Sequence, residues 1–352
     1  MNRYLKLAAA SLASATALAL LPVNPAYAGY GDDGGSGESS GSGSGDELGA
    51  SVKQTRVKIT TSGGSASPGK GNISSVDPNW TPPVCWYEPV ASPKQFKASV
   101  ENLKKKESLA PVATYLQWNS DLFEEHYGKK SEESPYDNYN IAQQGKGMWW
   151  RGVINPNRED EWGWEDCMKL MFWVPNGKTP DAPEAISSKV LAEYAYDSVR
   201  VPDTQIDMNP DGKQTVNVPT WIWLDRAKFK PIKVTASLPG TGLWATTTAT
   251  PVSLHIDPGT TDAEVFPKSG DCPLNDDGTI GTPYTKGKGS QDPPCGVTYL
   301  RSTQNSQAHD LKATLTWKIS WKGSGGTGDE LPDGTFGTTT PVTVQEFQAI
   351  NR

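Results

Sequence analysis

An alternation of eleven residues near the C-terminus constrains the fold more than any other stretch of the chain. From Leu311 to Trp321, apolar side chains take every second position, and Lys, Thr or Ser takes each position between them. Successive side chains of a β-strand point to opposite faces, so this pattern predicts a long strand with one buried and one solvated face. The glycine-rich segment 323–328 is expected to end it. We expect this strand to be the central strand of a C-terminal β-sandwich.

Shorter strand patterns fill the rest of residues 214–352. They are β-branched or aromatic, and proline and glycine separate them, which is typical of a sandwich of about seven strands. The expected strands are Val216–Leu224, Ile232–Leu238, Trp244–Ala249, Val252–Ile256, Val297–Tyr299, Leu311–Trp321 and Val342–Val344. Residues 259–296 are expected to be mostly loop.

The first 28 residues predict a secretory signal peptide. Arg3 and Lys6 precede an apolar stretch that ends near Val23, and Ala26-Tyr-Ala28 provides a cleavage site. A retained membrane anchor is the alternative, but the apolar stretch is short and no later segment approaches the ~20 apolar residues of a spanning helix. We therefore expect a secreted protein, extracellular or associated with the cell wall, without membrane insertion after cleavage.

Charge and composition narrow the choice of partners. Without residues 1–28 the chain keeps 31 basic and 40 acidic residues, a net charge of −9. This balance disfavours nucleic acids and anionic membrane surfaces as partners, because binding to both requires Lys and Arg.

Residues 29–50 contain 14 Gly or Ser and five acidic residues among 22, and they predict a disordered linker. Residues 51–83 predict a short strand at Arg56–Thr60 followed by a flexible loop.

The chain has four cysteines, at positions 85, 167, 272 and 295. An even number in an exported chain indicates disulfides. Of the three possible pairings we prefer Cys85–Cys167 and Cys272–Cys295, because each bond then stays inside one predicted domain. A zinc site would require closely spaced thiolates such as C-x-x-C, which do not occur. No metal site and no cofactor are expected.

Residues 84–205 combine helix patterns with a concentration of tryptophan. One helix is expected from Ser92-Pro93, with Phe96, Val100 and Leu103 on its buried face, and another over Ala185–Arg200. A looser pattern over Val112–His126 suggests a third. Between them, Gly128–Gly147 is expected to be a surface loop.

Five tryptophans occur between residues 149 and 173, beside an acidic run. Aromatic rings with neighbouring carboxylates can stack on sugars and bind their hydroxyls, so this stretch is a candidate carbohydrate site. The candidate residues are Trp149, Trp150, Trp162, Trp164 and Glu161. The alternative, which we favour, is that the rings pack around Cys85–Cys167 in a domain short of aliphatic core.

Several short motifs occur between roughly residues 80 and 350: Cys85-Trp-Tyr-Glu-Pro89, Leu191-Ala, Tyr194-Ala, Val201-Pro, Asn209-Pro, Val218–Leu224, Asp257-Pro-Gly259, Cys272, Cys295, Tyr299 and Trp317-x-x-x-Trp321. Together they resemble a set of exported actinobacterial proteins of no established function. The C-terminal part is similar to PKD-type immunoglobulin-like sandwiches, although Thr260-Thr261 replaces the usual Asp-Gly. It implies spacing or protein contacts and brings no catalytic residues.

The expected fold class is therefore α+β. It comprises a small helix-containing Trp-rich domain at residues 84–205, followed by an Ig/PKD-like antiparallel β-sandwich at residues 214–352.

Motifs for catalysis are weak. Gly64–Gly71 matches G-x-x-x-x-G-K, but the Ser or Thr that should follow is missing and the surroundings are linker. Asp207–Gly212 resembles the start of a Ca²⁺ loop, but Val218 stands where a Glu should be. The three histidines lie in no catalytic motif. Carboxylates at 124–125 and 160–166 could contain an acid/base pair.

We therefore predict a secreted, non-catalytic binding or structural protein of the cell envelope, not an enzyme, whose partner is an envelope protein or glycan. Two alternatives stay open: a carbohydrate-binding protein that uses Trp149–Trp173, and an envelope glycan hydrolase that uses the acidic residues.

Overall fold

The computed structural model describes residues 55–63, 71–107, 121–178, 180–224, 229–304 and 307–347. The predicted signal peptide and linker lie outside the described residues, as do residues 112–120 of the third expected helix. Antiparallel sheets dominate, with 42% strand against 17% helix, so strands set the architecture. This composition is consistent with the predicted β-sandwich.

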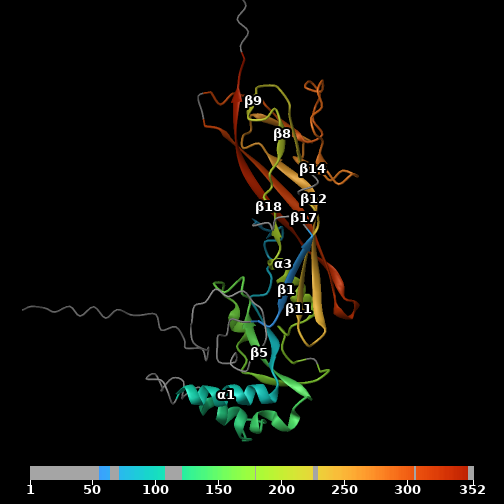
Figure 1. Ribbon diagram of the computed structural model, residues 1–352. Helices are drawn as coiled ribbons and strands as arrows, with labels where there is room; N and C mark the ends of the chain where they lie inside the picture. The colour runs from blue at the N-terminus through green and yellow to red at the C-terminus, as the bar shows by residue number, and fades with distance from the viewer. Residues whose placement is uncertain are drawn as a thin grey trace, which may run out of the picture.

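One large sheet runs along most of the elongated molecule (Figure 1). Its strand order is β1-β11-β12-β17-β18-β3, and β14 and β9 pair with β12 and β18. The strands are β1 Lys58–Gly63, β3 Ser74–Ser75, β9 Lys213–Thr215, β11 Ile232–Leu238, β12 Leu243–Asp257, β14 Asp271–Pro273, β17 His309–Gly323 and β18 Gly328–Gln345. The 15 residues of β17 span roughly 50 Å at 3.3 Å per residue.

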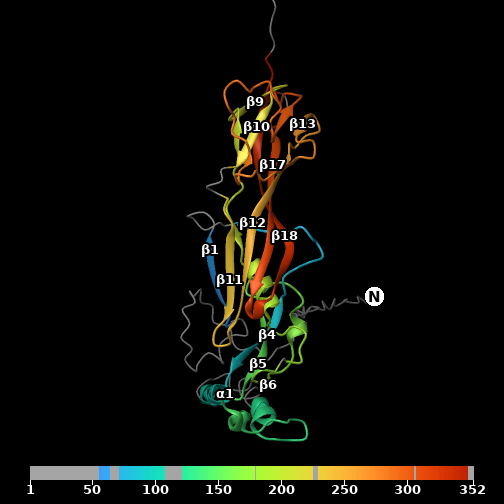
Figure 2. The same ribbon diagram turned by 90° about the vertical axis from the view of Figure 1, so that its right-hand side faces the viewer.

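The long alternating strand is confirmed. β17 lies inside the large sheet between β12 and β18, and all six of its predicted apolar positions are buried. Lys312, Lys318 and Ser320 on the opposite face are exposed. Figure 2 shows β1, β11, β12, β17 and β18 side by side.

Two expected strands are halves of one. Trp244–Ala249 and Val252–Ile256 both belong to β12, which continues through Pro251. The pairing with β17 shifts between Pro251 and Ser253, so a local bulge absorbs the proline. The expectation that Pro251 breaks the strand was therefore wrong.

The last expected strand is much longer than Val342–Val344. β18 begins at Gly328, and its glycines interrupt the alternation that would have revealed it. They are needed for close approach. A Cβ at Gly334 would lie 2.8 Å from Ile73, and one at Gly337 would lie 2.7 Å from Thr314 Oγ1.

Two different elements cover the inner face of the large sheet. At one end lies a second, five-stranded sheet in the order β13-β16-β10-β15, with β8 paired to β10. Its strands are β8 Asp207–Asn209, β10 Thr220–Leu224, β13 Ala263–Phe266, β15 Ile280–Gly281 and β16 Gly296–Tyr299. Residues 259–296 thus contain three short strands as well as loop, and the predicted Cys272–Cys295 disulfide joins β14 to the start of β16.

At the other end the cover is helix α3, Ser188–Asp197, which lies within the expected range Ala185–Arg200. The Ser187 side chain accepts the Val190 N–H at 3.2 Å and caps it. Thr247 Oγ1 of β12 donates to the Ala192 carbonyl at 2.8 Å. This helix therefore packs on strands of the C-terminal region, and one continuous hydrophobic core joins both covers to the large sheet.

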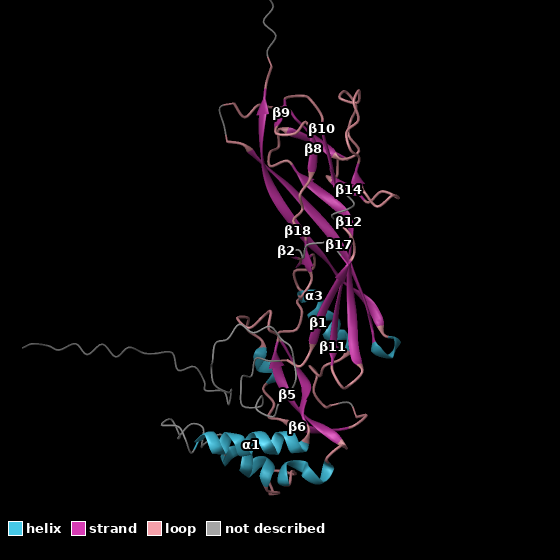
Figure 3. Ribbon diagram, viewed as in Figure 1, coloured by secondary structure: helices cyan, strands magenta, loops and turns pink. Residues whose placement is uncertain are grey.

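A small unit at one end of the molecule, which we call the head, contains a three-stranded sheet and α1 (Figure 3). Its elements are β4 Cys85–Ala91, α1 Pro93–Glu107, a π-helix Glu124–Gly128, a 3-10 helix Asn138–Gln143, β5 Gly147–Ile154, a 3-10 helix Trp164–Cys167 and β6 Phe172–Pro175. A short pair, β2 Gly71–Asn72 with β7 Arg200–Val201, lies outside it.

Helix α1 forms as expected. Ser92 Oγ accepts the Gln95 N–H at 3.4 Å, and Gln95 Oε1 accepts the Ser92 N–H at 2.9 Å, which is a reciprocal capping box. Phe96, Val100 and Leu103 are buried against the head sheet.

The alternation of β17 predicts unequal costs for neighbouring substitutions. Leu315→Ala removes a fully buried side chain from the shared core and should lower the free energy of unfolding by about 2–5 kcal/mol. Thr316→Ala, on the solvated face, should change it by less than about 0.5 kcal/mol. Urea denaturation of both variants measures the difference, and equal costs would contradict the assigned faces.

Candidate functional site

The tryptophans of the head do not share one exposed face. Trp149 is fully buried beneath α1, with its ring centroid 5.1 Å from that of Phe96. Its Nε1–H donates to the Tyr139 carbonyl at 3.2 Å. The Trp149 ring is therefore part of the aromatic core of the head and does not face solvent.

Trp150 points to the opposite side of β5. It packs, half-buried, against the cluster formed by the predicted Cys85–Cys167 disulfide, Tyr87 and Ala182. For this residue the geometry matches the packing interpretation of the tryptophan-rich stretch.

The remaining candidates lie on the loop between β5 and β6. Trp164 is half-buried, whereas 85% of Trp162 is exposed. Glu161 is exposed and accepts from Arg158 Nη1 at 2.7 Å. Arg158 also bonds Asp197 of α3, with Nε and Oδ2 at 3.2 Å. The five candidate residues are thus distributed over a core, a disulfide cluster and a loop surface.

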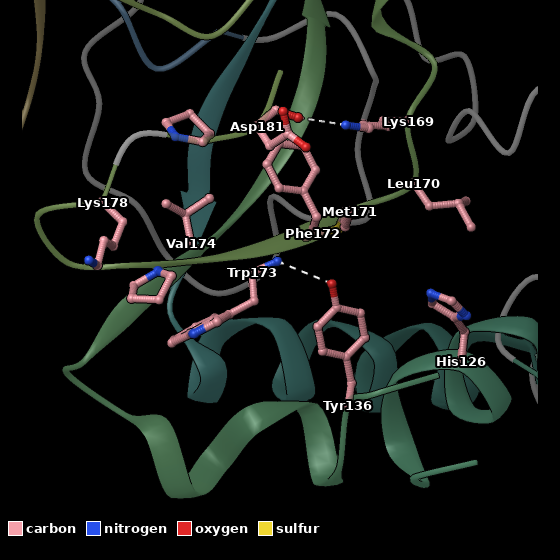
Figure 4. Close-up of a pocket in the computed structure, with 12 residues that line it drawn as sticks. His126, Tyr136, Lys169, Leu170, Met171, Phe172, Trp173, Val174, Lys178 and Asp181 are labelled. Carbon is pink, nitrogen blue, oxygen red and sulfur yellow. Dashed lines mark hydrogen bonds between the residues drawn. The ribbon is translucent and has the colours of Figure 1, made fainter. Parts of the chain in front are cut away.

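The head also contains a surface groove, at a place different from the five candidate residues. An open groove of about 490 Å³ follows β6 (Figure 4). Tyrosine, phenylalanine and tryptophan rings line it, together with charged and apolar side chains. The lining residues are His126, Tyr136, Lys169, Leu170, Met171, Phe172, Trp173, Val174, Pro175, Lys178, Pro180 and Asp181.

Hydrogen bonds fix the rings and charges of the groove. The Trp173 N–H donates to the Tyr136 hydroxyl at 3.4 Å, which ties the edge of β6 to the segment before the 3-10 helix Asn138–Gln143. Lys169 Nζ donates to the Asp181 carbonyl at 2.6 Å and lies 5.6 Å from the centroid of Phe172. Figure 4 shows both hydrogen bonds across the groove.

The aromatic core of the head supports this groove from behind. The rings of Tyr136 and Trp173 contact the buried Trp149 edge-on, at centroid distances of 4.7 Å and 5.7 Å. Trp149 therefore serves the groove indirectly, because it supports two of the rings that line it.

The groove wall that contains Lys169 and Leu170 is held in position next to the Cys85–Cys167 disulfide. Two residues beyond Cys167, the Lys169 N–H donates to the Tyr87 hydroxyl at 2.9 Å, and that hydroxyl donates to the Asp166 carbonyl at 3.2 Å. These bonds hold the end of the β5–β6 loop on β4, so the backbone that carries Lys169 and Leu170 is fixed.

The groove offers the chemistry of a binding site. Ring faces can stack on the apolar faces of a ligand, while Lys and His side chains can bond its oxygens. Sequence reasoning included Trp173 in the tryptophan-rich stretch but missed Tyr136, Lys178 and Asp181. The polar composition of residues 128–147 predicts a surface loop. The partly buried Tyr136 and buried Tyr139 contradict this, and two tyrosines in so polar a segment were the available signal.

Glu88 is a buried carboxyl group elsewhere in the head. Its oxygens accept from Thr55 Oγ1 at 2.6 Å, the Arg56 N–H at 2.6 Å and Trp86 Nε1 at 2.9 Å. Burial raises the pKa of Glu88 above 4.5, and these hydrogen bonds oppose the rise. All three donors belong to the protein itself. The Glu88 carboxyl group therefore has a structural role: it holds the segment before β1 against β4.

The remaining candidate features do not form a second site in the described residues. His255 and Asp271 form an exposed pair at 2.8 Å on the large sheet. Within the described ranges no group of three His, Cys, Asp or Glu side chains could hold a metal ion. None of the helices in the described part of the chain is long and apolar enough to cross a membrane.

Comparison of the chain with models of known protein families, with curated proteins and with solved structures gave no match.

The buried Glu88 predicts a pH dependence of stability. Its raised pKa means that the folded protein keeps this proton to a higher pH than the unfolded chain does. Stability from this group is therefore lost as the pH rises from about 4.5 through the folded-state pKa. Glu88→Gln cannot ionise, so relative to the native protein its free energy of unfolding should improve between pH 4 and pH 8.

Urea denaturation across that range measures the effect, with Glu161→Gln as the control for the same substitution at an exposed position. A difference between Glu88→Gln and the native protein that stays constant with pH would contradict the raised pKa.

Proposed function

We propose that this protein is an extracellular, non-catalytic binding protein of the cell envelope, and that its head binds a glycan in the groove along β6. The aromatic lining of this groove carries the proposal: Tyr136 and Trp173 lie on one face of β6, and Phe172 lies on the other. Open grooves suit polymers, because a chain can enter and leave at both ends.

The extracellular setting is supported by two features. The structure contains two disulfides, Cys85–Cys167 and Cys272–Cys295, and disulfides persist in oxidising compartments. The predicted signal peptide at residues 1–28 agrees with this setting.

The architecture suits presentation of a binding head. We propose that the two packed sheets form an Ig/PKD-like sandwich, like the C-terminal part of the exported actinobacterial proteins that the sequence resembles. We propose also that the head is a small Trp-rich domain. The groove lies in the head, at the end of the molecule opposite β9 (Figure 1). A long sheet then acts as a spacer that holds the groove away from the far end.

Binding without cleavage is supported better than the hydrolase alternative. Glycosidases generally use two carboxyl groups on either side of the scissile bond. Among the described residues that line the groove, Asp181 is the one carboxylate. The acidic residues of 159–166 are exposed on the β5–β6 loop, where Glu161 pairs with Arg158.

The experiment is a titration of the full mature chain with N-acetylglucosamine oligomers and with soluble peptidoglycan fragments, followed by tryptophan fluorescence and calorimetry. We expect saturable binding without release of shorter products. Trp173→Ala should weaken binding at least tenfold, about 1.4 kcal/mol, because it removes a stacking ring. Trp162→Ala, an equal truncation at an exposed tryptophan outside the groove lining, is the matched control.

Trp173 also contacts Trp149, so its loss could loosen the head. Lys178→Ala tests the groove at an exposed side chain, and near-ultraviolet circular dichroism should show that its fold is intact. Binding that Trp162→Ala abolishes and the groove variants leave unchanged would overturn the assignment, as would glycan turnover.

A further inference from the structure

The outer face of the large sheet carries a second distinctive surface, on the half whose inner face α3 covers. There the strands expose Lys58, Lys233, Lys318, Lys322, Trp244 and Glu330, with Ser or Thr at the positions between them. We call this surface the lysine–hydroxyl face.

Strand register shows that these side chains share one side. Residues paired across antiparallel strands point to the same face. Lys322 of β17 pairs with Thr246 of β12, Thr246 with Thr235 of β11, and Thr235 with Thr60 of β1. Such a row crosses four strands, and Thr235 and Thr246 bond through their hydroxyls at 2.7 Å.

The other lysines lie in neighbouring rows of the same face. Lys58 pairs with Ser237, which pairs with Trp244, and Lys233 pairs with Thr248. Thr247 lies between Thr246 and Thr248 in β12. Its side chain points to the opposite side of the sheet and is buried against α3. The lysine–hydroxyl face therefore turns away from the core.

This face is positive in an acidic protein. It carries four lysines against Glu330, which pairs with Lys318 at 2.8 Å, and the partly buried Asp333, which acts on the same lysine. Towards the other end of the sheet the outer face is balanced, since Asp257 pairs across strands with Lys312, and Asp271 bonds His255. An excess of positive charge thus occurs on one half of this outer face, whereas the chain without residues 1–28 has a net charge of −9.

The arrangement fits an acidic polysaccharide. Strand and row spacings place neighbouring lysines on the order of 12–14 Å apart, with hydroxyl groups filling the intervals. A flat array of hydroxyls matches sugar hydroxyls, the lysines match spaced carboxylates, and Trp244, which is 40% exposed, offers a ring for stacking.

The same features argue against nucleic acid as the partner. Proteins favour Arg for phosphate recognition because its planar fork bonds two oxygens at once. The strands β1, β11, β12, β17 and β18 contain no arginine. Their lysines also lie on the open face of a sheet, not along a groove that follows a phosphate backbone.

We propose that the lysine–hydroxyl face is a second binding surface, and that it binds an acidic, carboxylate-bearing polysaccharide. It is separate from the groove along β6, which lies in the head. The protein then contacts the cell envelope both through its head and along the side of its large sheet.

The test uses polygalacturonate as the probe and the full mature chain. Affinity electrophoresis and calorimetry at 50 and 300 mM NaCl should show binding that weakens markedly at the higher salt concentration. The double variant Lys233→Glu/Lys322→Glu should lose at least tenfold in affinity. Lys213→Glu/Lys312→Glu makes the same change in net charge at exposed positions outside the face, and should lose less than threefold.

Several outcomes would overturn the proposal. These are equal losses in the two double variants, binding of neutral dextran as strong as that of polygalacturonate, tighter binding of duplex DNA, and no binding at 50 mM NaCl. Trp173→Ala separates the two sites. It should leave polygalacturonate binding unchanged, so failure at the groove and failure at the lysine–hydroxyl face are distinguishable.

Discussion

The structure depends on the pairing of β17 with a long neighbour on each side while its apolar face is buried. Leu311, Leu315 and Trp317 lie at the centre of the shared core, and β12 and β18 cover both edges of the strand. Because the strand is long, no single element covers its inner face. The five-stranded sheet packs against one half and α3 against the other, and a single sheet thereby joins two dissimilar covers.

The head is connected to this sheet through a buried joint. Trp86 of β4 packs against Tyr194 of α3, with ring centroids 5.0 Å apart. Next to it, Glu88 holds the backbone of Arg56 just before the chain enters β1. Hydrogen bonds and aromatic packing thus orient the groove-bearing sheet relative to the large sheet. The groove is in turn supported by Trp149, so the position of its rings depends on the core of the head as well.

Strict periodicity predicted some elements well, and its interruptions explain the failures. β17 and the buried face of α1 follow from spacing alone. β12 and most of β18 do not, because only the paired strands reveal that a bulge accommodates Pro251 and that close neighbours require Gly334 and Gly337. For the site, nearness in sequence was misleading. Trp149 and Trp150 are adjacent on a strand, so they face opposite sides. The groove and the lysine–hydroxyl face combine residues from distant segments, which a single sequence does not bring together.

The direction of the outer strands has a mechanical consequence. β1 and β18 run the same way, since three antiparallel strands separate them in the order β1-β11-β12-β17-β18. The chain enters β1 beside the head, where Thr55 bonds Glu88, and leaves β18 at the far end. Tension between these two points acts along the strands and loads their ladders in shear, so that many hydrogen bonds must yield together. A protein anchored at one end and holding a polymer at the other would resist pulling in the direction in which its sheet is strongest.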